Sequence, residues 1–208
     1  MKPLVIWDWN NTLVDTMEAS FLAMQDVAKQ YGVPPVAKED MMTVIGTHRT
    51  YWQATFRDKE EEAVRYYLKQ YGTYRDTICV IEGAEDVLSF VQSKNIPQII
   101  LSNEDESLLF PETECTGLKH YFNYIQGSTD EHAKPELAFA QKALQHFDYD
   151  RLILIGDGIS DMQMAQVLGA TSICVFNNVP KTIKTHFRCE SLREVKLLLE
   201  KNYNKLKK

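Results

Sequence analysis

The sequence predicts an α/β fold in which a doubly wound parallel sheet carries an inserted all-helical segment. Three observations support this fold. Short apolar runs recur along the chain and are continuous rather than alternating, which is typical of parallel strands covered on both faces. Between these runs lie segments with apolar residues three or four positions apart, as in helices that cross between strands. One long segment after the first run shows helical spacing alone.

The strands are expected at five apolar runs, several of them rich in β-branched residues. These runs lie at Leu4–Trp7, Ile99–Leu101, Tyr124–Ile125, Leu152–Ile155 and Ser172–Phe176. Helices are expected where apolar residues form one stripe, at 87–91, 137–147 and 192–199. The alternation of strand and helix predicts the doubly wound arrangement.

The insertion is expected to form a helical domain of residues 17–80, while residues 1–16 and 81–208 form the α/β core. Apolar stripes at Phe21–Tyr31 and Val64–Tyr71 predict two of its helices. Pro34 and Pro35 are expected to end the first of them, because proline cannot continue a helix.

The composition is that of an ordinary globular protein, with 208 residues, 44% of them hydrophobic and 25% charged. A net charge of -6 argues against nucleic acid as a partner. No apolar stretch approaches the roughly 18 residues of a membrane span, and Asp8 interrupts the first run too early for a signal peptide. We therefore expect a cytoplasmic protein without a membrane partner. The four cysteines are scattered and lack the spacing of a zinc site.

Polar side chains follow several of the predicted strands, at the edge where open α/β sheets place their sites. Asp8–Thr12 follow the first strand, Ser102 and Asn103 the second, and Gly156–Asp161 the strand that begins at Leu152. With Lys134 they are expected to converge on one edge of the sheet. Carboxylates held that close repel one another unless a cation lies among them, and oxygen ligands of this kind suit Mg²⁺.

The ordered motifs resemble the haloacid dehalogenase-like superfamily. They stand as Asp8-Trp9-Asn10-Asn11-Thr12, Ser102, Lys134 and Gly156-Asp157-Gly158-Ile159-Ser160-Asp161. The resemblance covers nearly the whole chain, since the helical insertion is similar to the α-helical cap of the subgroup that includes phosphoglycolate phosphatases and β-phosphoglucomutases. It implies a Rossmann-like core and a hydrolase that acts on a small phosphorylated metabolite, as a monomer or a homodimer.

The resemblance also implies a role for each motif residue. Asp8 is the expected nucleophile, which forms an aspartyl-phosphate that water then hydrolyses. Mg²⁺ is expected on Asp8, on the main-chain carbonyl of Asn10 and on Asp157, with Asp161 completing or bracing its ligands. The phosphate group is expected to meet Thr12, Ser102, Asn103 and Lys134, and the Lys134 ammonium to neutralise charge as the transition state forms.

Two positions depart from the family pattern. Asn11 replaces a glycine, which is a mild change because asparagine tolerates positive φ. Asn10 replaces the aspartate that serves the family as general acid and base, and an amide cannot transfer a proton. That assistance is typically worth about 10²- to 10⁴-fold in rate. Three consequences stay open: a substrate whose leaving group needs no proton, another acid such as His48, or a slow or silent relative that binds phosphorylated ligands.

The inserted segment carries the candidate substrate contacts. Residues 45–50 resemble the loop that faces the active site in capped relatives, which makes His48 and Arg49 candidate substrate residues. An arginine where phosphonate-cleaving relatives carry a Schiff-base lysine disfavours phosphonatase activity, and Asp157 with Asp161 disfavours a dehalogenase, which needs no metal-binding acids. The acidic run 104–106 is interpreted as a helix start that points away from the site.

Overall fold

The computed structural model describes residues 2–46, 48–129 and 132–206, and the chain divides into two compact units. One unit contains residues 1–14 and 80–208, and the other residues 15–79. The chain passes between them at β2 (Val14–Asp15) and β3 (Cys79–Val80), which pair as a two-stranded sheet. In the sequence, the second unit is therefore an insertion after the first strand of the larger unit.

The larger unit is built on a six-stranded sheet, in which every described strand pair is parallel. This confirms the predicted fold class. The strand order is β5-β4-β1-β6-β7-β8, with bounds β1 Pro3–Trp7, β4 Gln98–Asp105, β5 Tyr124–Ser128, β6 Arg151–Gly156, β7 Thr171–Val175 and β8 Phe187–Cys189. The short edge strand β8 was not predicted, because three residues do not form a recognisable apolar run.

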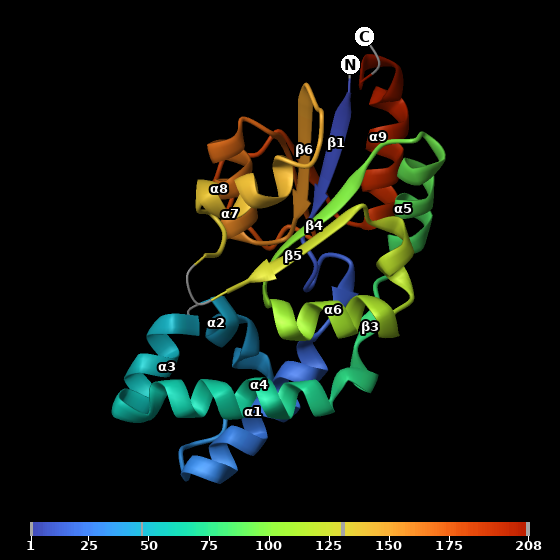
Figure 1. Ribbon diagram of the computed structural model, residues 1–208. Coiled ribbons are helices and arrows are strands. Elements are labelled where there is room, and N and C mark those ends of the chain that lie inside the picture. Colours follow the sequence, from blue (N-terminus) through green and yellow to red (C-terminus); the bar gives the residue numbers. More distant parts are fainter. Residues whose placement is uncertain (1, 47, 130–131, 207–208) are drawn as a thin grey trace. The chain divides into compact units, whose positions relative to one another are not determined.

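Helices cover both faces of this sheet (Figure 1). On one side lie α5 (Ala84–Ser93) and α9 (Leu192–Leu206), which pack against each other, and on the other side lie α7 (Leu137–Leu144) and α8 (Ile159–Leu168). Alternate residues of the central strands, such as Leu4 and Ile6, pack with Phe139 of α7 and Met162 of α8 in one buried cluster. Burial on both faces explains why the sequences of these strands are continuous apolar runs.

The register of the sheet brings the carboxyl ends of its central strands together. Trp7 pairs with Ile100 on one side and with Ile155 on the other. The Asp8 N–H extends this ladder by donating to the carbonyl of Ile155 over 2.9 Å. The residues that follow these strands must therefore meet at one edge.

The register of β4 against β5 shifts between Leu101 and Asp105, an irregularity of the β-bulge kind that we call the bulge of β4. The strand continues through this bulge to Asp105, beyond its predicted end, and α6 (Glu106–Cys115) begins only then. The Asp105 side chain caps α6 by accepting from the Ser107 N–H over 2.8 Å. The expectation that Glu104 belongs to a helix start is thus wrong: a bulge re-aims side chains at a strand end, and here Glu104 turns inward.

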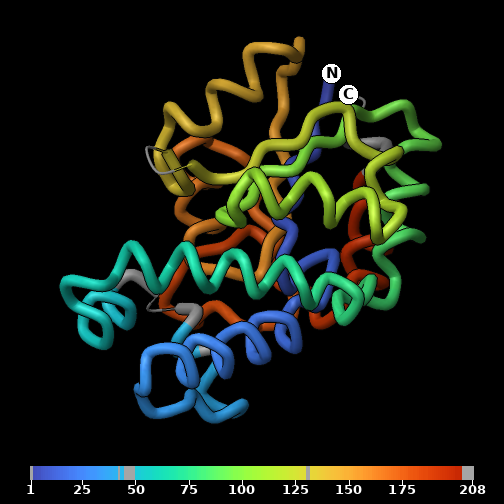
Figure 2. Tube along the Cα trace, turned by 60° about the horizontal axis from the view of Figure 1, so that its bottom comes forward, coloured from blue at the N-terminus to red at the C-terminus, as the bar shows by residue number. Residues whose placement is uncertain are grey.

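The smaller unit is helical and has its own core. Its helices are α1 (Met17–Tyr31), α2 (Met41–Gly46), α3 (His48–Phe56) and α4 (Glu60–Thr73), with single turns of 3₁₀ helix at Lys38–Asp40, Arg57–Lys59 and Arg75–Thr77. Helices α1 and α4 run side by side (Figure 2). Trp52 stacks on Phe56 with ring centroids 5.0 Å apart, and both pack with Met24 and Val27 of α1.

Helix α1 ends earlier than the proline pair. Its cap is Gly32, at φ 64°, whose N–H donates to the carbonyl of Ala28. Glycine adopts this left-handed conformation without a steric penalty, so it ends the helix before Pro34 is reached.

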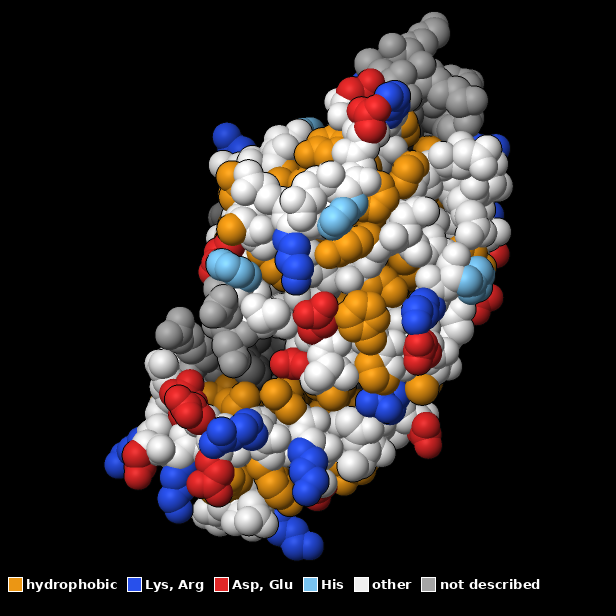
Figure 3. All heavy atoms as spheres, viewed as in Figure 1, with side chains coloured by type: hydrophobic (Ala, Val, Ile, Leu, Met, Phe, Trp, Pro, Cys, Tyr) orange, Lys and Arg blue, Asp and Glu red, His pale blue; other side chains and the backbone are white. Residues whose placement is uncertain are grey.

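A broad, open groove of about 670 Å³ lies on the larger unit, lined by residues of α6, of a 3₁₀ turn at Leu118–Tyr121 and of β5. Its lining includes Phe110, Phe122 and Tyr124 but none of the predicted site residues. Exposed apolar side chains gather on this face of the molecule (Figure 3). None of the described helices is both long and apolar enough to span a bilayer.

Candidate active site

A buried ammonium group joins two carboxylates at the carboxyl edge of the sheet. Lys134 Nζ lies 2.6 Å from Asp8 Oδ1 and 2.5 Å from Asp161 Oδ1. The Lys134 side chain is 2% exposed, so its charge has little access to water. Asp8 follows β1 and Asp161 lies in the first turn of α8, which means that this contact links three segments distant in sequence.

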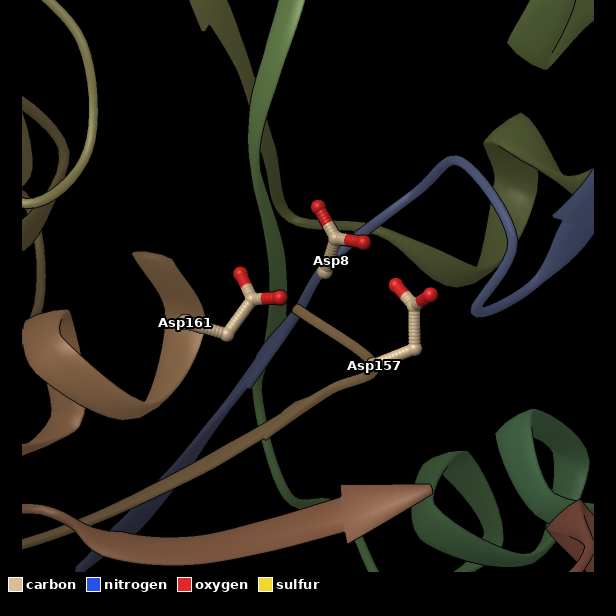
Figure 4. A group of neighbouring side chains, drawn as sticks. All are labelled: Asp8, Asp157 and Asp161. Carbon is tan, nitrogen blue, oxygen red and sulfur yellow. The ribbon is translucent and has the colours of Figure 1, made fainter. Parts of the chain in front are cut away.

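Asp157, which follows β6, is the third acid of the cluster. The carboxyl groups of Asp8, Asp157 and Asp161 approach one another (Figure 4), and one oxygen from each lies within 4.8 Å of the others. The Thr12 hydroxyl lies 3.0 Å from Asp8 Oδ2 and 3.1 Å from Asp157 Oδ1, and it can donate its single proton to either. The predicted convergence of carboxylates, hydroxyl and ammonium is therefore present.

The charges of this cluster are not balanced by its own residues. Burial, together with the charges of Asp8 and Asp161, raises the pKa of Asp157 to about 7. Burial and Asp8 raise the pKa of Asp161 to about 6, against the lowering effect of Lys134. Burial alone would lower the pKa of Lys134, but Asp161 and Asp8 outweigh it and the net direction is upward.

These residues fit a divalent cation. Three carboxylates share one ammonium, and the pKa values of two acids are raised because negative charge gathers in a buried place. A second positive charge among hard oxygen ligands would relieve that repulsion. Asp8, Asp157 and Asp161 can supply such ligands.

Local structure explains how each acid is aimed. Asn11 has φ 57°, and the turn after β1 closes with Leu13 N–H donating to the Trp9 carbonyl over 2.9 Å. The expected positive φ at Asn11 is thus confirmed. Asp161 Oδ2 accepts from the Gly158 N–H over 2.9 Å. A Cβ on Gly156 would lie 2.4 Å from Asp161 Cγ, so only glycine leaves room for this carboxylate.

The second predicted motif lies at the bulge of β4. Ser102 is buried, and its hydroxyl oxygen accepts from the Glu104 N–H over 3.0 Å, an interaction that does not use the hydroxyl proton. Asn103 has a different contact: its Oδ1 accepts from the main-chain N–H of Lys134 over 2.8 Å. The Asn103 side chain thus holds the main chain of Lys134 in place.

Asn10 faces an acid that sequence reasoning assigned to the exterior. Asn10 Nδ2 donates to Glu104 Oε2, and Asn10 Oδ1 is buried without a hydrogen-bond partner in the described structure. Burial and the charge of Glu112 raise the pKa of Glu104 to about 8, although the hydrogen bonds from Asn10 and from the Asp105 N–H oppose this shift. Glu112 itself is fully buried and accepts from Trp9 Nε1 over 2.8 Å.

Asn178 is a second contact that sequence reasoning missed. Its Nδ2 donates to Asp157 Oδ2 over 3.0 Å. Phe176 and Asn177 both have positive φ and turn the chain after β7, so that Asn178 reaches the neighbouring strand end. Arg188 holds this loop through the carbonyls of Val179, Pro180 and Ile183. The one available signal was that Asn178 lies just beyond a strand end.

The two candidates from the insertion are not placed. His48 and Arg49 are the first residues of α3, but their side chains lie outside the described residues. Their predicted contact with substrate stays a prediction.

The sequence matches one family model, and the similar proteins of known name include several phosphatases. A family model described as haloacid dehalogenase-like hydrolase matches residues 5–175. A phosphoglycolate phosphatase of Chromobacterium violaceum is 24% identical over 188 residues, which are 82% of this chain and 83% of that protein. A probable phosphatase of Dickeya dadantii is 24% identical over 187 residues, which are 84% of this chain and 81% of that protein.

Solved structures share the fold. A haloacid dehalogenase-like family hydrolase from Streptococcus pneumoniae superposes with a TM-score of 0.84 at 20% identity, covering 96% of this chain and 98% of its own. A structure from Geobacter sulfurreducens, described as a HAD-superfamily hydrolase of subfamily IA, has a TM-score of 0.76 at 23% identity. The match covers 96% of this chain and 100% of that chain. At these identities the likeness establishes the fold alone.

Cation binding is expected to depend on pH. The pKa values of Asp157 and Asp161, about 7 and about 6, lie above the ordinary 3.8. Without metal, their protonated forms therefore favour the folded state at low pH, and this contribution is lost as pH rises through about 6 to 7. Because Mg²⁺ needs the ionised carboxylates, it should raise the melting temperature more at about pH 7.5 than at about pH 5.5. Thermal unfolding in the presence of Mg²⁺ or EDTA measures this rise in melting temperature. The control is Asp157→Asn, in which Mg²⁺ should no longer raise the melting temperature. Equal shifts at both pH values would contradict it.

Gly156→Ala is expected to displace the Asp161 carboxylate, because the new Cβ would lie 2.4 Å from its Cγ. Overpacking of this kind typically costs about 1 to 3 kcal/mol, measurable by urea unfolding. The Mg²⁺-dependent rise in melting temperature should also shrink. Gly158→Ala is the matched control, since its Cβ would lie 3.1 Å from Asp161 Oδ2 and a small shift relieves the contact. An equal loss in both variants would argue against the close-approach explanation.

Proposed function

Because the chain belongs to the haloacid dehalogenase-like hydrolase family, we propose that it is a Mg²⁺-dependent phosphatase acting on a small phosphorylated metabolite through an aspartyl-phosphate on Asp8. The observation that carries the proposal is the buried contact of Lys134 Nζ with Asp8 Oδ1 and Asp161 Oδ1. This contact supports the proposal because it holds the proposed nucleophile against a buried positive charge, with one further acid, Asp161, on the same ammonium group.

In the proposed first step, a carboxylate oxygen of Asp8 attacks phosphorus, and the bond to the leaving-group oxygen breaks. Asp8 is held on both sides, by Lys134 at Oδ1 and by the Thr12 hydroxyl at Oδ2, so its carboxylate is oriented before substrate arrives. Splitting hydrolysis into two displacements replaces one difficult step with two easier ones.

The approach of one anion to another requires positive charge. Mg²⁺ held by Asp8, the Asn10 carbonyl and Asp157, with Asp161 bracing the set, would supply charge that offsets that of the nucleophile and the phosphoryl group. The Lys134 ammonium adds a further positive charge, 2.6 Å from Asp8 Oδ1. Asn178 Nδ2 donates to Asp157 Oδ2 over 3.0 Å, which restricts the rotation of this carboxylate.

The phosphoryl group is proposed to bind between Ser102 and Lys134. The Ser102 oxygen already accepts from the Glu104 N–H, so its hydroxyl proton can donate to a phosphoryl oxygen. Asn103 supports this subsite by fixing the main chain of Lys134, and Thr12 supports it by orienting Asp8. We propose the helical insertion, residues 17–80, as the cap that contacts the rest of the substrate through His48 and Arg49.

The relatives named phosphoglycolate phosphatase make phosphoglycolate the first substrate to test. A second candidate function follows from Asn10, because an amide at the proton-transfer position suits a protein that binds phosphorylated ligands without turning them over. Retention of Asp8, Ser102, Lys134, Asp157 and Asp161 favours the enzyme, since binding alone does not require an aligned nucleophile.

Phosphate release should require both the cation and Asp8. With a panel of phosphorylated metabolites, EDTA should abolish release, and Asp8→Asn should reduce it by about 10³-fold or more, because the amide is not a nucleophile. Asp148→Asn is a matched control, since the Asp148 carboxylate is exposed and pairs only with Lys2 among its described contacts. Binding of substrate without release in the unmodified protein would favour the silent module, and equal rates in Asp8→Asn would exclude the proposed nucleophile.

A further inference from the structure

We propose that Glu104 is a positioning residue that fixes the Asn10 amide as a hydrogen-bond acceptor for the reaction, so that the site favours substrates whose leaving group departs without a proton. This inference rests on the proposed phosphatase function and specifies its substrate class: acyl phosphates and phosphoanhydrides rather than alkyl phosphates. It is carried by contacts around two residues, Asn10 and Glu104.

Glu104 is held firmly from several sides. Its N–H donates to Ser102 Oγ over 3.0 Å, and its Oε1 accepts from the Asp105 N–H over 3.1 Å. Its carbonyl lies 3.2 Å from Ser128 Oγ, which has a shorter contact of 2.8 Å with the Asn103 carbonyl. A Cβ on Gly127 would lie 2.8 Å from the Glu104 carbonyl oxygen, so β5 approaches this segment as closely as glycine allows. The bulge and its contacts therefore set the direction of the Glu104 side chain.

The orientation of the Asn10 amide follows from its partner. Glu104 Oε2 accepts from Asn10 Nδ2, which commits the donor end of the amide. Asn10 Oδ1, the acceptor end, is buried and has no hydrogen-bond partner in the described structure. An unsatisfied buried acceptor is costly, so the geometry points to a donor that arrives with the reaction.

An acceptor at this position can serve only one of the two steps. In the second step, water attacks the phosphorus of the aspartyl-phosphate, the bond from phosphorus to the Asp8 oxygen breaks, and its electron pair returns to the carboxylate. Asn10 Oδ1 can accept a hydrogen bond from that water and orient it, while both protons of the water leave on dihydrogen phosphate. In the first step, Asn10 has no proton to give to the leaving oxygen.

The leaving group must then depart as a stable anion. A carboxylate or a phosphate does so near neutral pH, whereas the alkoxide of an alkyl phosphate needs a proton. The missing assistance is worth about 10²- to 10⁴-fold and falls on alkyl phosphates alone.

Residues 10 and 104 also form a matched pair. An aspartate at position 10 would face the Glu104 carboxylate, with buried Glu112 close enough to add repulsion. The two carboxyl groups would repel or share one proton, and either outcome commits the new acid to Glu104. Exchanging the groups in Asn10→Asp/Glu104→Gln keeps the hydrogen bond with its direction reversed and leaves the carboxyl group at position 10 able to transfer a proton.

The experiment compares acetyl phosphate with phosphoglycolate in the unmodified protein, Asn10→Asp, Glu104→Gln and the double exchange. We expect the unmodified protein to prefer acetyl phosphate by about 10²-fold or more in kcat. The double exchange should raise kcat for phosphoglycolate by about 10²-fold, so that the preference for acetyl phosphate becomes smaller. Asn10→Asp alone should raise kcat for phosphoglycolate clearly less than the double exchange does. Glu114→Gln is the matched control, because the Glu114 carboxylate is exposed and pairs with Lys119.

Thermal unfolding gives a readout that does not need activity. Asn10→Asp should lower the melting temperature by about 2–4 °C or more, and adding Glu104→Gln should restore it. If Asn10→Asp matches the double exchange in both melting temperature and phosphoglycolate turnover, the pairing is overturned. If no form releases phosphate from either substrate, the proposed function fails, and the melting temperatures still decide whether the two residues are coupled.

Discussion

A buried ammonium between two carboxylates is the contact on which this site depends. Lys134 Nζ lies within 2.6 Å of both Asp8 and Asp161, and all three side chains are almost entirely shielded from water. Removing one partner of such a group typically costs about 3 to 5 kcal/mol, because the other charge is left buried without compensation. The same contact orients the proposed nucleophile. Stability of the sheet edge and orientation of the proposed nucleophile therefore have one origin.

The remaining features keep this edge in register. Parallel pairing of β1 with β4 and β6 brings Asp8, Ser102 and Asp157 to one edge, and Gly156 leaves the space that Asp161 needs. Burial first, and then the charges of neighbouring acids, raises the pKa of Asp157 to about 7 and of Asp161 to about 6, and the cluster has three carboxyl groups for one ammonium. A divalent cation would offset the charge of these acids, and in the proposed function Lys134 and Ser102 would donate to the phosphoryl group.

Asn10 gives the site its individual character. An amide at position 10 cannot transfer a proton, and the structure shows that its donor end has a defined partner. Glu104 holds its nitrogen, and the bulge of β4 holds Glu104. In the proposed function, Asp8 and its neighbouring acids are thus combined with an amide at position 10 whose donor end is held by Glu104, and this pairing is the basis of the inferred preference among leaving groups.

Much of this organisation could be predicted from the sequence. Continuous apolar runs identified the central strands, because residues buried on both faces must all be apolar, and polar residues just after those runs marked the carboxyl edge. Asp8, Asp157, Asp161 and Lys134 were found because each stands at a motif position. Asn11 was expected to adopt positive φ, and it does.

Only the tertiary structure decided which side chains face one another. The position of Asn178 beyond a strand end could not reveal its contact, and neither could that of Glu104, since their partners, Asp157 and Asn10, are distant in sequence. A bulge and two consecutive residues at positive φ turn these side chains toward the site, and such irregularities arise from packing between strands rather than from the periodicity of one segment. Periodicity specifies which face of an element is buried; the direction of a single side chain at a strand end depends on its neighbours in space.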